Sequence, residues 1–330
     1  MDGVGGTVVE IACDESGFSG TNLLDAATPV FTHASVDLRV DEAAELILVL
    51  RRGFRWSLNE FKSGPFLRGP QAGGALEWLL GALSGRAHVH SVDKEYFLVT
   101  RIVDLFLSEP SYAAGTRMTQ DCRPAAASLY RAGRAGGRDW GVFLAAFVQL
   151  VRTKRPHQPD RSVVERFFQA RDSLAGTGLG AEAEDVLDGL SRTRVRAVLT
   201  QLAHDDPSIP PPLEPMLPAL AETVLFWSGG QRQVLVIHDE QSALTASRLR
   251  RLQLVLTDSA GSPAADTHNA EAALASVSPL AGLVTVDSRD DPRVQVADLL
   301  AGVARRSLTI GQHGLLQPFL SATSLRDPAR

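Results

Sequence analysis

Short apolar runs near the start of the chain predict strands. Thr7–Cys13 is rich in β-branched and apolar residues and leads into Asp-Glu-Ser-Gly, so we expect a buried strand that ends in a turn at Asp14–Gly17. Val30–Val36 alternates between two faces, which is typical of a second strand able to form a hairpin with the first. The same reasoning predicts a strand at Ala87–Val92, a strand or extended segment at Phe54–Phe61, and helices after an Asp41 N-cap, at Gln71–Leu83 and at Glu95–Leu107.

From about residue 110 to residue 230 the strand signals vanish and helical periodicity dominates. Glycine-rich breaks at Gly133–Gly137 and Gly176–Gly180 and a proline-rich stretch at Pro207–Pro218 separate the apolar stripes. We interpret this block as a helical insertion. Its helices are expected at Asp139–Arg152, Arg161–Leu174, Glu182–Leu202 and Glu214–Trp227.

Alternation of strands and helices then resumes. Strands are predicted at Gln233–Ile237 and Leu283–Val286, and helices at Ser242–Leu256 and Asp291–Arg306. This order favours an α/β fold, a mixed sheet flanked by helices and interrupted by a helical insertion. Residues 1–109 and 231–310 would form the two parts of one core, residues 110–230 the insertion, and residues 311–330 an irregular tail.

Composition narrows the class of protein. The 330 residues are 44% hydrophobic and 22% charged, which excludes general disorder. A net charge of −5 argues against a protein that coats nucleic acid through bulk positive charge. Two cysteines make a disulfide scaffold or a thiolate zinc site a poor fit. The sequence has no signal-peptide pattern and no run of about 18 apolar residues, so we expect a cytoplasmic protein with no membrane partner.

Acidic residues fall where the predicted strands end. Carboxylates gathered beyond the carboxyl ends of strands would repel one another unless they shared protons or a divalent cation. Oxygen ligands alone select hard cations, so the expected cofactor is Mg²⁺ or Mn²⁺. The acids in question are Asp14, Asp93, Asp239 and Asp287 after strands, Glu60 in Asn59–Lys62, and Asp298 inside an otherwise apolar helix.

Each of these acids also has a structural interpretation. An Asp after a strand is often a turn former or a helix N-cap, and for Asp93 that is the favoured interpretation. Asp298 is the most informative, because its neighbours on the predicted helix are apolar and Gln295 lies on the same helix face. A hydrogen-bonded structural Asp is the alternative at that position.

Several segments, taken together, resemble a known family. They are Ile11-Ala12-Cys13-Asp14-Glu15-Ser16-Gly17, Glu60-Phe61-Lys62, Val286-Asp287-Ser288, and Gln295-Val296-Ala297-Asp298-Leu299-Leu300-Ala301-Gly302. The chain resembles the family called domain of unknown function 3800, which opens with Asp-Glu-Ser-Gly and closes with a Gln-x-Ala-Asp helix. That family is similar to the ribonuclease H fold, so the resemblance implies a ribonuclease H-like core and metal-dependent nuclease chemistry.

The resemblance also implies roles for individual residues. Asp14, Glu60, Asp239 and Asp298 would be metal ligands, and Lys62 would neutralise or orient the scissile phosphate. Glu15, Ser16 and Gln295 would be hydrogen-bond partners around the cation. The catalytic set would then be Asp14, Glu60, Lys62 and Asp298.

The function expected from these residues is hydrolysis of a phosphodiester by a metal-activated water, on a nucleic acid or nucleotide substrate. A second possibility is a non-catalytic binding or regulatory module on a nuclease-like scaffold, as in a defence or mobile-element system, with the helical insertion as a surface for a protein partner. A third is a hydrolase that uses two carboxylates without metal, as glycosidases do.

Overall fold

The computed structural model describes residues 7–18, 20–54, 63–69, 71–152, 161–260, 278–312 and 314–327. The chain divides into two compact units. Unit 1 contains residues 1–18, 30–91 and 219–324, and unit 2 contains residues 19–29, 92–218 and 325–330.

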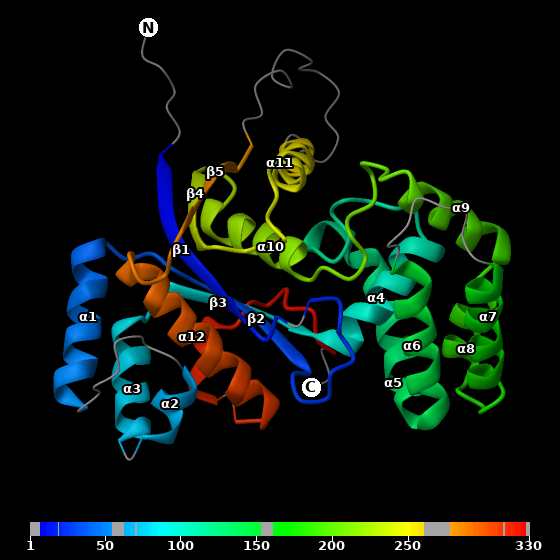
Figure 1. Ribbon diagram of the computed structural model, residues 1–330, viewed down its shortest axis with the longest axis horizontal. Helices are drawn as coiled ribbons and strands as arrows, with labels where there is room; N and C mark the ends of the chain where they lie inside the picture. Colours follow the sequence, from blue (N-terminus) through cyan, green and yellow to red (C-terminus); the bar gives the residue numbers. More distant parts are fainter. Residues whose placement is uncertain are drawn as a thin grey trace, which may run out of the picture. The chain divides into compact units, whose positions relative to one another are not determined.

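A five-stranded mixed sheet forms the centre of unit 1 (Figure 1), as the α/β prediction required. The strand order is β3-β2-β1-β4-β5. β1 pairs antiparallel with β2 and parallel with β4, and β4 pairs parallel with β5. The strands are β1 (Val8–Ser16), β2 (Val30–Val36), β3 (Ala87–Asp93), β4 (Gln233–Asp239) and β5 (Leu280–Val286).

The predicted hairpin is confirmed, but the predicted turn at Asp14–Gly17 is wrong. Asp14, Glu15 and Ser16 continue β1, where they pair with Ala34, His33 and Thr32 of β2. Pairing with a second strand supplies ladder hydrogen bonds that outweigh the turn preference of a polar tripeptide. The strand gives way only at Gly17, whose φ is +86°.

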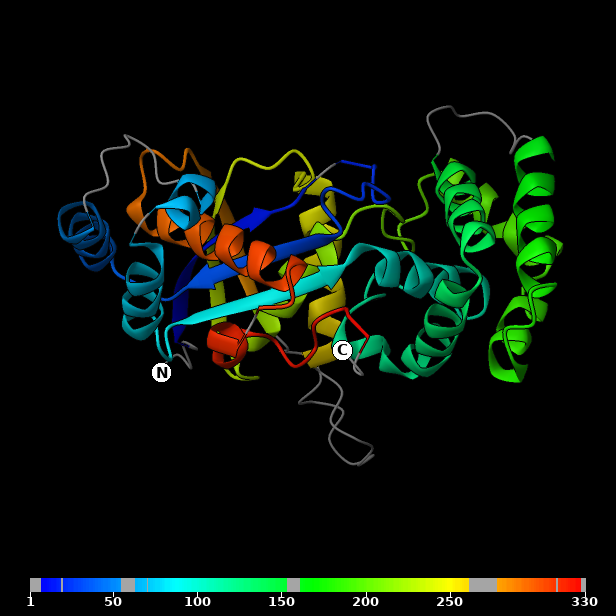
Figure 2. The same ribbon diagram turned by 90° about the horizontal axis from the view of Figure 1, so that it is seen from below.

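Helices cover both faces of this sheet. α12 (Pro292–Thr309) runs along β1 and β2 (Figure 2), and its Ala297, Leu300 and Ala301 join the apolar cluster that contains Ala34 and Val36 of β2. α10 (Met216–Ser228) contributes Thr223 and Trp227, which hydrogen-bond to His33 and Ser35. Successive residues of a strand point to opposite faces, so even-numbered residues of β2 face α12 and odd-numbered ones face α10.

The remaining helices of unit 1 are α1 (Val40–Gly53), α2 (Ser63–Arg68), α3 (Ala72–Ala82) and α11 (Ala246–Ala260). The Asp41 N-cap is wrong, because Asp41 lies inside the first turn and Arg39 is the N-cap. Glu42 accepts a hydrogen bond of 2.8 Å from the backbone N–H of Arg39. α11 begins four residues later than predicted. The predicted tail contains the 3-10 helix η3 (Gly314–Phe319).

The described part of unit 2 consists mainly of helices joined by loops. Asp93 is the N-cap of α4, with Oδ1 accepting from the backbone N–H of Tyr96 at 3.0 Å, which confirms the structural interpretation of that residue. The elements are α4 (Lys94–Phe106), η1 (Arg117–Cys122), α5 (Arg123–Ala135), α6 (Arg138–Val151), α7 (Arg161–Ala175), α8 (Ala181–Asp188) and α9 (Arg192–Ala203).

Two predictions in this unit need correction. The single helix expected at Glu182–Leu202 is two helices, because the chain breaks at Gly189 and Ser191 caps α9 by accepting from the backbone N–H of Arg194. Gly133 was interpreted as part of a break but lies inside α5. A Cβ at that position would be 2.3 Å from the Trp140 ring, so the glycine allows α5 to pack closely on α6.

Candidate functional site

Two predicted acids come from neighbouring parallel strands of unit 1 and share one face of the sheet. Ala12 of β1 pairs with Ile237 of β4. Asp14 and Asp239 lie two residues further along their strands, so both belong to the face that α12 covers. Asp298 lies in α12 itself. The sheet register and the helix thus bring these three carboxyl groups to the carboxyl ends of β1 and β4.

Asp14 is the most buried of the three, with 6% of its surface exposed. Its Oδ1 accepts a hydrogen bond of 2.7 Å from the backbone N–H of Glu15. Burial raises the pKa of Asp14 to about 9, and the negative charges of Glu15, Asp298 and Asp239 add to this increase. Asp14 therefore holds a proton at neutral pH unless a cation replaces it.

Asp239 and Asp298 are half-buried. Asp239 is the last residue of β4, and its Oδ1 accepts a hydrogen bond of 3.1 Å from the backbone N–H of Ser288, just beyond β5. That bond fixes the carboxyl group and uses one of its two oxygens. Asp298 is near enough to raise the pKa of Asp14 through its charge. Carboxyl groups from β1, β4 and α12 thus interact electrostatically at this edge of the sheet.

Glu15 follows Asp14 on the opposite face of β1, and its charge still contributes to the raised pKa of Asp14. It accepts a hydrogen bond from Gln241, and its Oε2 is 3.9 Å from Nε2 of His238. Burial raises the pKa of Glu15 to about 7, against the lowering effect of the Gln241 hydrogen bond. Glu15 Oε2 is buried and accepts no hydrogen bond from any described residue.

Two buried histidines lie beside Glu15. Nε2 of His238 is 3.2 Å from Nε2 of His33, whose Nδ1 is 2.8 Å from the Thr223 hydroxyl. Nδ1 of His238 is 2.9 Å from the carbonyl oxygen of Asp239 and must donate to it. Burial lowers the pKa of His238 to about 4, so this histidine is neutral at physiological pH. The pair anchors the end of β4 and leaves Glu15 without a nearby positive charge.

Ser16 contacts an arginine rather than a carboxylate. Its hydroxyl accepts a hydrogen bond of 2.9 Å from Nε of Arg305, in the last turns of α12. Gly17 gives the arginine room, because a Cβ there would be 2.7 Å from Arg305 Cδ and 2.3 Å from the carbonyl oxygen of Val30. The Ser-Gly half of the opening motif therefore positions the Arg305 side chain at the end of β1.

Three other residues discussed from the sequence have different partners. Gln295 donates from Nε2 to the carbonyl oxygen of Arg289 at 3.3 Å, which holds the loop before α12. Asp287 pairs with Arg289, and that pairing lowers the pKa of Asp287 to about 2. Asp93 also accepts a hydrogen bond of 2.8 Å from the Tyr130 hydroxyl in unit 2. These interactions give each of the three a structural role.

Glu60 and Lys62 lie outside the described residues, as does the predicted extended segment beyond Phe54. Ser63, the next described residue, lies against α12. A Cβ at Gly302 would be 1.9 Å from Ser63 Oγ. Gly302 is one helical turn beyond Asp298, so the glycine of the closing motif allows α2 to approach the helix that presents the acid.

The oxygen donors of the site suit a hard dication, but the present positions of the side chains do not surround one. Carboxylate oxygens from Asp14, Asp239 and Asp298 are ligands that Mg²⁺ and Mn²⁺ prefer. In the ranges described above, however, no three His, Cys, Asp or Glu side chains converge closely enough to surround a metal ion. The donor set fits a hard dication, and its side chains would have to turn toward a common point to bind one.

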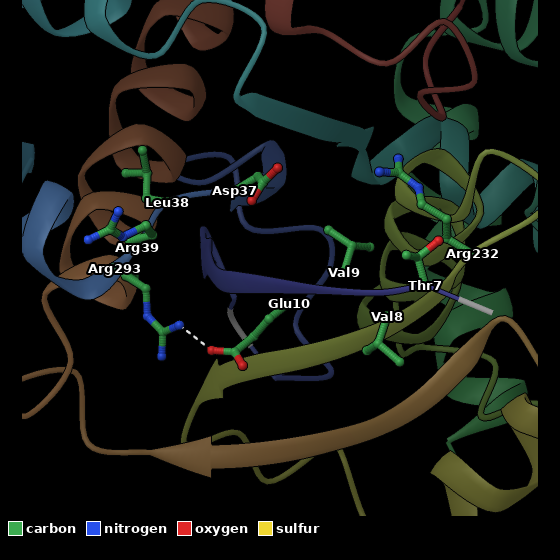
Figure 3. A pocket seen from close by; sticks show the side chains of 9 residues that line it. All are labelled: Thr7, Val8, Val9, Glu10, Asp37, Leu38, Arg39, Arg232 and Arg293. Carbon is green, nitrogen blue, oxygen red and sulfur yellow. Dashed lines mark hydrogen bonds and ion pairs between the residues drawn. The ribbon is translucent and has the colours of Figure 1, made fainter. Parts of the chain in front are cut away.

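An open pocket of about 550 Å³ lies at the other end of β1 (Figure 3). Three arginines line it, and each already has a protein partner. Arg293 pairs with Glu10 and Asp291, Arg39 pairs with Asp41, and Arg232 donates to the carbonyl oxygen of Trp227. The pocket is thus a neutralised depression at the edge opposite the acids. Its lining residues are Thr7, Val8, Val9, Glu10, Asp37, Leu38, Arg39, Arg232 and Arg293.

Arg305, His33 and Gln241 were not among the residues expected at the site. A signal for Arg305 was available, since it lies seven residues after Asp298 and residues seven apart share a helix face. His33 and Gln241 gave no comparable signal. Their roles depend on the pairing of β1 with β2 and on the loop after β4.

Comparison with protein families, with characterised proteins and with solved structures finds no match for this chain. In the part of the chain that the structure describes, no helix combines the length and apolar character needed to cross a bilayer. The geometry of the acids is therefore the evidence from which a function can be argued.

Proposed function

We propose that unit 1 is a ribonuclease H-like phosphodiesterase or nuclease that uses Mg²⁺ or Mn²⁺, as members of the family called domain of unknown function 3800 are expected to be. The observation that supports this most directly is the environment of Asp14. This carboxyl is buried, and the charges that raise its pKa, those of Glu15, Asp298 and Asp239, are all negative. A divalent cation would relieve that repulsion.

Asp14, Asp239 and Asp298 would hold the cation. When bound, Mg²⁺ or Mn²⁺ would supply an activated water and would neutralise the charge that develops on the phosphate. Asp14 must lose its proton on binding, so the affinity for the cation rises with pH. The hydrogen bond from Ser288 fixes Asp239, and burial against α12 limits the freedom of Asp14. Glu60 and Lys62 remain predictions of the sequence, as a further ligand and a phosphate contact.

Thermal unfolding in a Mn²⁺ titration tests this proposal. A cation that binds the folded state raises the melting temperature by mass action, by about 2.7 kcal/mol of stability at one hundred times its dissociation constant. We expect the rise in the wild type and its loss in Asp14→Asn and Asp298→Asn. Asp287→Asn is the matched control, because Asp287 follows a neighbouring strand but pairs with Arg289.

Cleavage of a labelled oligonucleotide is the second measurement. We expect Mn²⁺-dependent cleavage that Asp14→Asn and Asp298→Asn abolish while Asp287→Asn retains it. A melting temperature that does not respond to millimolar Mn²⁺ would favour the non-catalytic binding module. Hydrolysis that survives a chelator would favour a pair of carboxylates acting without metal.

A further inference from the structure

The strand β1 and the helix α12 each contribute two polar side chains to the same region of unit 1. Asp14 and Ser16 are two residues apart and lie on the same face of β1. Asp298 and Arg305 are seven residues apart on one face of α12. The negative charge of Asp298 interacts with Asp14, and Arg305 donates a hydrogen bond to Ser16. Ser16, which accepts the hydrogen bond from Arg305, thus lies one pleat repeat, roughly 7 Å along β1, from Asp14.

Contacts on both sides hold Arg305 in this position. The Thr32 hydroxyl, opposite Ser16 in the sheet, donates to the carbonyl oxygen of Ala301 at 2.8 Å and ties α12 to β2 one turn before the arginine. Side chains of a helix lean toward its N-terminus, which directs Arg305 back toward Asp298. Gly17 leaves space for the aliphatic stem. The guanidinium is therefore oriented before any ligand arrives.

The remaining donors of this guanidinium are available to a ligand. Nε donates to Ser16. In the part of the chain that the structure describes, Nη1 and Nη2 make no contact with an acidic side chain, and the residue is half-buried rather than enclosed. A planar fork with free N–H groups beside a carboxylate cluster suits the oxygens of a phosphate.

We infer that Arg305, held by Ser16, binds a phosphate group of a nucleic acid strand next to the phosphodiester that lies over the carboxylates. This inference rests on the proposed function, since it assigns the substrate of the same site. It also gives a role to three of the four residues of the opening motif: Asp14 faces the acids, Ser16 orients the arginine, and Gly17 makes space for it.

Binding measured without cleavage tests this assignment. The probes are a fluorescently labelled single-stranded oligodeoxynucleotide and its RNA counterpart, titrated in Ca²⁺ and, separately, in a chelator. We expect Arg305→Gln to weaken binding about tenfold, the effect of losing one charge-assisted contact. The slope of log affinity against log salt should shrink by about 0.7, the value for one phosphate contact on a single strand.

Arg306→Gln is the matched control, because Arg306 is adjacent on the same helix but exposed. It should leave both the affinity and the salt slope unchanged within error. Ser16→Ala keeps the positive charge but removes its anchor, so we expect a smaller loss of affinity with an unchanged salt slope. This variant also keeps the test open if Arg305→Gln does not fold.

The outcomes separate the two proposals. Equal salt slopes for the wild type and Arg305→Gln, equal losses in Arg305→Gln and Arg306→Gln, or no binding of either probe would overturn the role of Arg305. The Mn²⁺ shift of the melting temperature should be the same in Arg305→Gln as in the wild type. Its absence in the wild type would remove the cation proposal while leaving the phosphate contact to be judged on the salt slopes.

Discussion

Unit 2 buries an arginine beside an aspartate, whereas unit 1 buries an aspartate among other acids. In α4, Nη1 of Arg101 lies 3.6 Å from Oδ2 of Asp104, with 1% and 4% of the two side chains exposed, and the guanidinium lies over the Phe97 ring. In β1, Asp14 has like charges around it. Burial raises the pKa of both aspartates, but only Asp104 has a positive partner that opposes the increase.

The two surroundings distinguish charges that have a structural role, in unit 2, from charges that would bind a ligand, in unit 1. An opposite pair compensates itself within the protein, and replacing both members by apolar groups can be neutral or stabilising. Like charges at one site cost stability until something positive arrives, and such a cost is typical of functional sites. Removing one charge should therefore have opposite effects in the two units.

Breaking the pair in unit 2 should have the largest effect. Asp104→Leu leaves Arg101 charged and buried, because a guanidinium keeps its proton even in the protein interior. We expect a loss of about 3–5 kcal/mol in the free energy of unfolding, measured by urea denaturation. Adding Arg101→Met to this variant should restore stability to the wild-type level or exceed it. A single variant that loses less than about 1 kcal/mol would contradict the comparison.

Removing the buried acid of unit 1 should act in the opposite direction. Asn at position 14 can still accept the hydrogen bond from Glu15 but carries no charge. With a chelator present at pH 8, we expect Asp14→Asn to be more stable than the wild type by roughly 2–4 kcal/mol. Excess Mn²⁺ should stabilise the wild type alone and reverse the order. Destabilisation by this substitution in the chelator would assign Asp14 a structural role.

Close helix packing gives a way to perturb each unit separately. Gly133→Ala places a Cβ against the Trp140 ring in unit 2, and Gly302→Ala places one against Ser63 in unit 1. Each overpacked contact should cost about 1–3 kcal/mol. Native-state hydrogen exchange should show faster opening mainly in the helices of the affected unit. Equal acceleration throughout the chain after either change would mean that the units open together.

The pH dependence of stability should show the smallest change, when the free energy of unfolding is compared over one pH unit. The pKa of Asp14 is about 9 in the folded state and near 3.8 when unfolded, so between these values the folded state holds a proton that the unfolded state has released. Without metal, the free energy of unfolding should therefore fall as pH rises from about 4 to about 9, by at most about 1.4 kcal/mol per pH unit. For Asp104 the same fall is confined to pH below about 6.

Denaturation at several pH values with a chelator measures this slope. Asp14→Asn should flatten the curve above pH 7, where Asp104 and Glu15 have already ionised, and Asp287→Asn should not flatten it there. The pKa of Asp287 is lowered to about 2, so it affects stability only in stronger acid. A wild-type curve with no slope between pH 7 and 9 would mean that Asp14 is ionised throughout that range.

Much of the fold follows from local patterns in the sequence. The apolar run of β4 and the alternation in β2 identify strands, and the apolar face of α12 identifies a helix. The errors occur where tertiary contacts override composition. Pairing with β2 extends β1 through three polar residues, and packing against Trp140 retains a glycine within α5. Neither contact can be read from a short window of sequence.

The candidate site shows the same division. Strand ends and an isolated acid in an apolar helix were sufficient to single out Asp14, Asp239 and Asp298. The role of Ser16 depends on which helix crosses β1 and at what register, so Arg305 could be recognised only once α12 was placed against the strand. The contacts of Glu15 with Gln241 and His238 depend in the same way on the loop after β4 and on the pairing of β1 with β4.

The long interval in the chain between β1 and β4 has a consequence during protein synthesis. β1 ends at Ser16 and β4 begins at Gln233, and roughly 220 residues at about 5–20 residues per second take roughly 10–45 s to translate. Throughout that time one edge of β1 lacks its neighbour, and its open N–H and C=O groups invite pairing with other nascent chains. Newly made protein should therefore depend on chaperones at this stage. A nascent chain on the ribosome would also lack α12, and therefore the assembled acid site.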